Sequence, residues 1–184
     1  MPLNHASIYT DLTDEHYSLI GRVVVEWSNV EFLLGSLLSR LLFTPEFPGR
    51  VFSRAMGAAR LQLSIKDALE LHKLRYRNKI VSEDLHLKIS QINHQLDKLR
   101  TTRNKFAHFC WARTSDNEIF GTGFSSANWD SKRSVKNSAS FTVQELKDFH
   151  AQLYKIVDEF SYIIEQIPEM QEDGISKKLG KSAA

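Results

Sequence analysis

Apolar residues recur at helical spacing along the first third of the chain, between about residues 13 and 42. Such a period places them on one face of an amphipathic helix. Thr13 is a suitable N-cap for this helix, and Pro45 and Pro48 are expected to stop it at its other end. The predicted apolar face consists of Ile20, Val23, Val24, Trp27, Leu34, Leu38, Leu41 and Leu42.

The same period predicts three further helices. A short helical piece is expected at about 50–56, followed by a second helix over roughly 58–76 and a third over about 83–107 that Ser82 caps. The last helix begins at a capping box, with Thr142 at the N-cap and Glu145 at the third helical position. Their apolar faces are Leu61, Ile65, Ala68, Leu69 and His72; Leu85, Ile89, Ile92, Leu96 and Leu99; and Leu146, Phe149, Leu153, Ile156, Phe160, Ile164 and Ile167.

A segment of different composition separates the last two helices. Residues 109–113 and 118–124 are rich in aromatic and β-branched side chains, which predicts two short strands joined by a turn at Ser115-Asp116-Asn117. Residues 125–140 are expected to form a loop, or a loop with a third strand near Val135. The sequence therefore predicts an all-α fold, a bundle of four to five helices with a small β-hairpin inserted before the last helix.

Composition limits the domain organisation and the cellular location. The chain has 184 residues, a net charge of +2 and a single cysteine, Cys110, so it cannot form an internal disulfide. We expect an N-terminal arm over 1–12, a single helical domain over 13–167 and a disordered tail over 168–184. No signal peptide or membrane-spanning stretch is apparent, so we expect a cytoplasmic protein with no membrane partner. The basic run between Lys73 and Lys79 is typical of a solvated helix end.

Two charged residues occupy positions that belong to the apolar faces. At about 100° per residue, Arg103 falls at the centre of the third helix's stripe and Glu31 near the centre of the first helix's stripe. Burying a lone charge is costly, so such residues are usually paired. We predict that Glu31 and Arg103 contact each other, either as a purely structural ion pair or as a support that holds the guanidinium at the edge of a polar site.

His108 lies one helical turn beyond Asn104, near the end of the third helix, and about 140° around the helix from Arg103. It can belong to a site with these residues, or it can be an ordinary histidine favoured by the negative end of the helix dipole. His72, in the middle of an apolar stripe, is expected to be a hydrogen-bonded core histidine. The sequence lacks a zinc-protease histidine pair and a phosphate-binding loop, and we expect no metal and no cofactor.

The segment Arg103-Asn104-Lys105-Phe106-Ala107-His108 resembles the R-x(4–6)-H signature of HEPN domains, in the form in which Asn follows the Arg. HEPN domains are helical bundles with this signature late in a long helix. The resemblance in architecture covers about residues 13–167. One departure is Cys110, which stands where a subgroup of the family carries a tyrosine that its antitoxins modify.

The resemblance implies a metal-independent endoribonuclease, of the kind found in toxin–antitoxin and phage-defence systems, with Arg103 and His108 as catalytic residues and Asn104 in support. It further implies RNA as the substrate, a homodimer that brings two motifs together, and an antitoxin or other regulatory protein as a partner. The aromatic residues Phe106, Phe109 and Trp111 suggest an apolar surface for such a dimer. The alternative is a non-catalytic helical module that binds a protein partner or a nucleotide.

Overall fold

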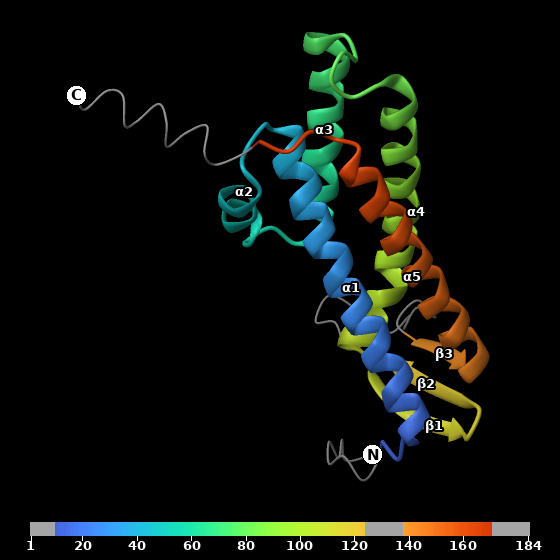
Figure 1. The fold of residues 1–184 in the computed structure, drawn as a ribbon. Helices are drawn as coiled ribbons and strands as arrows, with labels where there is room; N and C mark the ends of the chain where they lie inside the picture. The colour runs from blue at the N-terminus through green and yellow to red at the C-terminus, as the bar shows by residue number, and fades with distance from the viewer. Residues whose placement is uncertain (1–9, 124–137, 171–184) are drawn as a thin grey trace, which may run out of the picture. The chain divides into compact units, whose positions relative to one another are not determined.

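The computed structural model describes residues 10–123 and 138–170, which form a mainly helical protein with one small antiparallel sheet (Figure 1). In these ranges the helices are α1 (Asp14–Leu41), α2 (Glu46–Ser53), α3 (Ala58–Tyr76), α4 (Glu83–His108) and α5 (Val143–Glu165). The strands are β1 (Cys110–Ser115), β2 (Glu118–Thr122) and β3 (Ser138–Thr142). None of the helices in the described part of the chain is long and apolar enough to cross a membrane.

The predicted starts of α4 and α5 are confirmed by the local chemistry that suggested them. The hydroxyl of Ser82 accepts a hydrogen bond from the backbone N–H of Leu85 at 3.2 Å. At the start of α5, the Thr142 N–H donates to the Glu145 carboxylate at 2.7 Å, and the Glu145 N–H donates to the Thr142 hydroxyl at 3.1 Å. The predicted apolar faces of α3 and α4 are buried throughout, so the helical period identified the core of these two helices correctly. On the predicted face of the first helix, however, Leu42 is 45% exposed because it lies just beyond the end of α1.

The prediction for α2 was wrong at its start. This helix begins at Glu46 and contains Gly49 and Pro48, the second of the two prolines that were expected to stop the first helix. Pro48 occupies the third helical position, where the backbone N–H has no partner within the helix and its absence costs nothing. Gly49 is needed for packing, because a Cβ there would lie 2.2 Å from the hydroxyl of Ser39 in α1.

The predicted hairpin is part of a three-stranded sheet of order β1-β2-β3. The first two strands and their turn are as expected, but residues 138–140, assigned to a loop, belong to β3 and pair with β2. The pairing of Phe141 with Ile119 gives β3 its register, and a short strand of Ser, Ala and Thr carries little signal of its own in sequence. Val135, near which a third strand was considered, lies outside the described residues.

By its contacts the chain divides into two compact units, each described here by itself. Unit 1 comprises 1–27 with 98–155, and unit 2 comprises 28–97 with 156–184. This division does not test whether residues 13–167 form a single domain, which stays a prediction. Most of the expected N-terminal arm and of the expected tail lie outside the described residues.

An aromatic cluster at the end of α4 forms part of the core of unit 1. Phe106 is 4% exposed, and its ring centroid lies 4.7 Å from that of Phe141 and 5.5 Å from those of Trp111 and Phe149. Gly121 leaves room for the indole, because a Cβ there would lie 2.5 Å from the Trp111 ring. The expectation of an exposed apolar surface at Phe106 and Trp111 was therefore wrong, because both rings are buried against each other and against Phe141 of β3.

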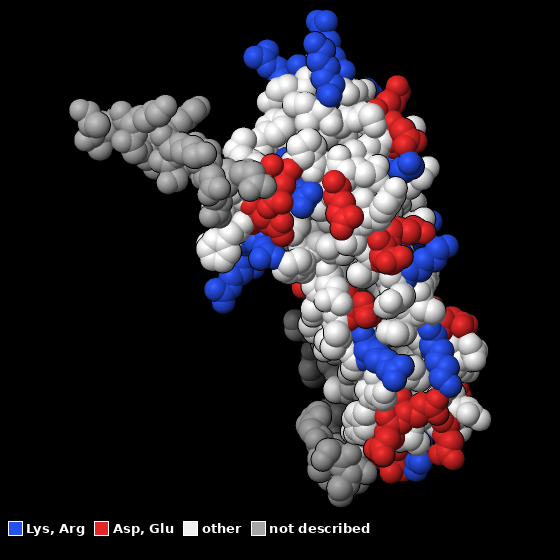
Figure 2. All heavy atoms as spheres, viewed as in Figure 1, with Lys and Arg blue, Asp and Glu red and all other residues white. Residues whose placement is uncertain are grey.

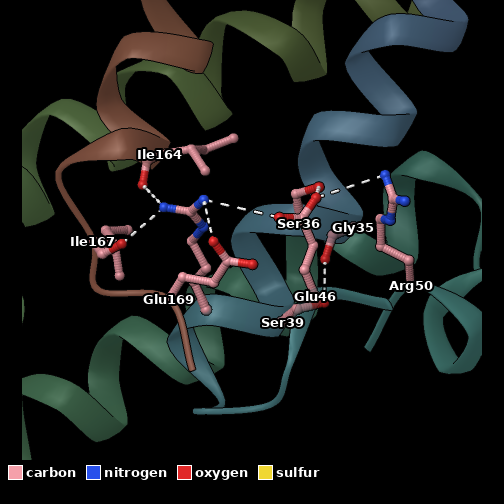
Figure 3. A network of polar contacts seen from close by, with 9 residues as sticks. Gly35, Ser36, Ser39, Glu46, Arg50, Ile164, Ile167 and Glu169 are labelled. Atoms are coloured by element: carbon pink, nitrogen blue, oxygen red, sulfur yellow. Dashed lines mark hydrogen bonds and ion pairs between the residues drawn. The ribbon is translucent and has the colours of Figure 1, made fainter. Parts of the chain in front are cut away.

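Arg40, at the end of α1, contacts the end of α5, the start of α2 and Glu169, all within unit 2 (Figure 3). Its Nη1 donates to the carbonyl oxygens of Ile164 and Ile167, both at 2.9 Å, so it caps the end of α5. Its Nη2 forms ion pairs with Glu46 of α2 at 3.8 Å and with Glu169 at 3.6 Å. Because it satisfies carbonyls that a helix end leaves open, the role of Arg40 is structural.

Two predictions about polar residues in unit 2 are confirmed. His72 is fully buried, and its Nε2 lies 2.8 Å from the carbonyl oxygen of Leu41, the last residue of α1. The basic residues between Lys73 and Lys79 are exposed at the end of α3, and Figure 2 shows Lys and Arg side chains gathered there. They form a solvated helix end.

His16 has a structural role that the sequence reading missed. It stands at the third position of α1, where its Nδ1 accepts the N–H of Thr13 and its own N–H donates to the Thr13 hydroxyl, both at 3.2 Å. The imidazole thus takes the part that Glu or Gln plays in a capping box. Unlike an exposed cap, this ring is fully buried.

We expect His16→Ala to lower the free energy of unfolding by about 2–4 kcal/mol, since it removes a cap and leaves a cavity. His16→Gln keeps an acceptor at the capping position and should lose clearly less. Urea denaturation of the two variants and the wild type measures this difference. Equal losses of unfolding free energy in the two variants would show that His16 stabilises the fold by packing alone and not by capping α1.

The capping box of α5 predicts a dependence of stability on pH. The pKa of Glu145 is lowered because its carboxylate accepts hydrogen bonds from the Thr142 backbone N–H and hydroxyl. A carboxylate with a lowered folded-state pKa stabilises the fold above its unfolded pKa, and this contribution is lost as the pH falls through the folded pKa. Below about pH 5, the unfolding free energy of the wild type should therefore fall more steeply than that of Glu145→Gln, as denaturant titrations at several pH values can show. Parallel curves would contradict the assignment.

Candidate functional site

The motif residues lie at the end of α4, in unit 1. Arg103 and Asn104 are half-buried, whereas His108 is exposed and is the last residue of the helix. Over the last two turns of α4 the motif side chains therefore become more exposed, from the half-buried guanidinium of Arg103 to the exposed imidazole of His108. This agrees with the sequence-based expectation that the helix ends at the motif.

Arg103 rests on the indole of Trp27, a residue of α1 that also belongs to unit 1. The guanidinium carbon lies 5.6 Å from the centroid of the Trp27 ring, within the range of a cation–π contact. Its Nη1 donates to the Asn104 side-chain oxygen at 3.5 Å, a long hydrogen bond. The buried Nε has no hydrogen-bond partner among the described residues. Within unit 1 the guanidinium is thus held mainly by a ring face, and its Nε is without a partner in the described part of the chain.

The sheet fixes the end of α4 from which these side chains project. The indole N–H of Trp111 in β1 donates to the carbonyl oxygen of Phe106 at 3.4 Å, one of the carbonyls that a helix end leaves without a partner. The Phe109 N–H donates to the Lys105 carbonyl at 2.9 Å and closes the last turn. The sheet therefore acts as a C-terminal cap that holds the motif end of the helix in place.

His108 does not join Arg103 in a direct contact. With the described residues of unit 1 it makes no hydrogen bond or ion pair, and its place five residues beyond Arg103 puts it about 140° around the helix. The exposed imidazole is free to meet a ligand from solvent. The geometry thus gives two separated groups, a held guanidinium and a solvent-facing imidazole, on one helix end.

Glu31 is half-buried and lies in α1, within unit 2. Because Arg103 belongs to unit 1, the predicted ion pair between them stays a prediction. Sequence reasoning recognised Trp27 as a core residue but not as the support of Arg103. The sequence did indicate this role, because Trp27 lies one turn before Glu31 on the same face of the helix, and Glu31 was the predicted partner of Arg103.

Metal-ligating side chains are not gathered at this site. In residues 10–123 and 138–170 no group of three or more His, Cys, Asp or Glu side chains is placed to hold a metal ion. Cys110 is free and exposed at the start of β1. Comparison of the chain with family models finds no match, and neither does comparison with curated proteins or with solved structures.

Proposed function

We propose that this protein is a metal-independent endoribonuclease of the HEPN type, with Arg103, Asn104 and His108 as its catalytic group. The observation that carries the proposal is the state of Arg103: its guanidinium rests on the Trp27 ring, and its Nε is without a hydrogen-bond partner among the described residues. The unpartnered Nε does not by itself distinguish Arg103, because the Nε of the structural Arg40 also lacks a partner among the described residues; the stacking on Trp27 does. A guanidinium held by stacking is suited to binding phosphate oxygens.

The proposed reaction needs no group beyond RNA and protein side chains. The 2′-hydroxyl oxygen attacks the adjacent phosphorus and gives up its proton to a base, while the P–O5′ bond breaks and the 5′ oxygen takes up a proton. The products are a 2′,3′-cyclic phosphate and a free 5′-hydroxyl. Histidine can act as base or as acid near neutral pH, and the Arg103 guanidinium stabilises the charge on the phosphorane.

A homodimer would explain why one chain presents a single histidine. Two copies of His108 facing one cleft would supply the base from one chain and the acid from the other. The partners implied are then RNA, a second copy of the chain, and a protein that restrains the activity, as antitoxins do for toxins. Glu31 would serve as a supporting residue if it reaches Arg103.

The experiment is incubation of the purified full chain with a mixed RNA pool in EDTA, followed by analysis of the product ends. Cleavage with 2′,3′-cyclic phosphate and 5′-hydroxyl ends supports the proposal. Intact RNA at micromolar protein, or cleavage that appears only when a divalent metal is added, would contradict it.

A non-catalytic interaction module is the second candidate, and the surface of α2 favours it. This short helix leaves Phe47, Val51 and Phe52 exposed by 66%, 60% and 71% of their surface. Beside them, the guanidinium of Arg50 stacks on Phe32 of α1 at 4.2 Å from the ring centroid. Several exposed large apolar side chains on one short element are typical of a surface that binds a protein.

A further inference from the structure

The short helix α2 turns its small residues inward and its large apolar residues outward. Its buried residues are Gly49 and Ser53, whereas Phe47, Val51 and Phe52 are exposed. Burying Phe and Val would stabilise the protein far more than burying Gly and Ser, because the stabilisation grows with the apolar area removed from water. An apolar face turned outward in this way is typical of a surface that another molecule covers.

Contacts with α1 fix this orientation of α2 (Figure 3). The Glu46 carboxylate accepts a hydrogen bond from the Ser36 hydroxyl at 3.0 Å and forms an ion pair with Arg40 at 3.8 Å. Gly49 lies so close to α1 that a Cβ on it would be 2.2 Å from the Ser39 hydroxyl oxygen, so no larger residue of α2 can take its place. The exposed apolar side chains therefore keep their direction, and a surface fixed in advance loses less conformational freedom on binding.

A positive charge lies beside the apolar residues of this face. Phe47, Val51 and Arg54 are four and three residues apart, so they lie along one line of the helix. Arg54 follows the last residue of α2 with helical backbone angles, φ −53° and ψ −35°, and continues this line. It is exposed and forms no ion pair within the described residues. The single acid of the segment 46–54, Glu46, is engaged with α1, so the outward face carries a positive charge and no negative one.

The size of the exposed face fits a short segment of a partner. An eight-residue helix is about 12 Å long, and its three large apolar side chains expose on the order of 300–400 Å². A stable interface between two folded proteins needs about 800 Å² from each partner. Two copies of the chain that met only through α2 would therefore bury too little surface for a stable dimer, whereas two or three turns of another helix can cover the face.

We propose that the exposed face of α2 binds an amphipathic helix of another protein, one whose apolar stripe is flanked by Asp or Glu. The apolar stripe packs on Phe47, Val51 and Phe52, and an acidic side chain pairs with Arg54. This inference names the partner of the interaction-module function and rests on it, whereas the proposed nuclease is independent of it.

The test is selection from a displayed library of short helical peptides on the purified full chain. The library keeps leucine at helical spacing and varies the flanking positions among Asp, Glu, Lys, Arg and Ser. We expect the enriched peptides to carry an excess of Asp and Glu and to bind saturably in fluorescence polarisation. Enriched peptides that bind at α2 without this excess would overturn the acidic partner and leave the interaction surface standing. If no peptide binds the wild type better than the double variant Val51→Ser with Phe52→Ser, the acidic partner and the interaction surface are both overturned.

Three single variants locate the binding. Phe52→Ser should weaken binding of the enriched peptides about tenfold or more, as the loss of a central apolar contact does. Arg54→Glu should weaken it several-fold by placing two like charges together. Leu74→Ser is the matched control, because Leu74 is 76% exposed on α3 between Lys73 and Arg75, and this variant should bind as the wild type does. Equal losses for Phe52→Ser and Leu74→Ser would overturn the assignment to α2.

Two further measurements test the other possible occupants of this face. Co-sedimentation with vesicles of phosphatidylcholine and phosphatidylserine should leave the wild type in solution. Vesicle binding that Phe52→Ser abolishes would overturn the proposal in favour of a membrane surface, and a dimer in sedimentation velocity that the same variant dissociates would overturn it in favour of a second copy. The enriched peptides should bind His108→Ala as tightly as the wild type, so the result does not depend on whether the protein cleaves RNA.

Discussion

Replacing His108 by alanine is expected to lower the rate of RNA cleavage by about 10²–10⁴, the usual cost of losing one acid–base group. The melting temperature should change little. His108 is exposed and ends α4, so its truncation opens no cavity and removes at most a dipole interaction of about 0.3–1 kcal/mol. Cleavage rates on a mixed RNA pool in EDTA, with thermal melting of the same samples, measure both quantities.

His94→Ala is the matched control for this change. His94 is also an exposed histidine of α4, but it lies outside the motif, so its variant should cleave at the wild-type rate. A wild type that leaves RNA intact, together with a His108→Ala variant that melts several degrees lower, would make the histidine structural. The interaction-module function, supported by the exposed face of α2, would then be preferred.

Local chemistry is what made the helices predictable. The caps at Ser82 and Thr142 involve residues only three positions apart, so the sequence contains both partners side by side. Likewise, a helical period depends only on neighbours along one helix, and the buried faces of α3 and α4 follow it. These features need no knowledge of the rest of the fold.

The features that sequence reasoning missed depend on residues far apart in the chain. Whether Phe106 and Trp111 are surface or core is decided by β3, which brings Phe141 against Phe106. Position 49 of α2 requires a glycine because Ser39 of α1 packs against it. Neither neighbour can be read from the segment itself.

The same distinction applies to the candidate site. The stripe position of Arg103 predicted a buried charge in contact with Glu31. The structure gives a half-buried guanidinium whose neighbour in unit 1 is an aromatic ring, and the contact with Glu31 stays a prediction. Periodicity places residues on a face and cannot choose between a carboxylate and an indole as the partner. The exposure of His108 followed from its place at the helix end, whereas its relation to Arg103 depends on how far the two side chains reach.

Phe106→Ala is expected to be the most destabilising of these substitutions, at about 3–5 kcal/mol. The ring is 4% exposed and contacts three aromatic rings from β1, β3 and α5, so no single neighbour can fill the cavity. For a chain of this length the loss corresponds to a fall in melting temperature of about 6–20 °C. Phe120→Ala is the control, because that ring lies in the same sheet but is 43% exposed; its cost should be within about 1 kcal/mol.

The same variant tests whether the two compact units unfold together. Residues of α1, α4 and α5 belong to both units, and a helix forms cooperatively along its length, so damage in unit 1 should propagate through these helices. We therefore expect one transition for Phe106→Ala, with tryptophan fluorescence and far-UV circular dichroism giving the same midpoint. If fluorescence changes first while much of the helical signal remains to a higher temperature, unit 1 unfolds by itself. The single domain predicted over 13–167 would then be wrong, and the proposed catalytic residues would lie on a separately unfolding part of the protein.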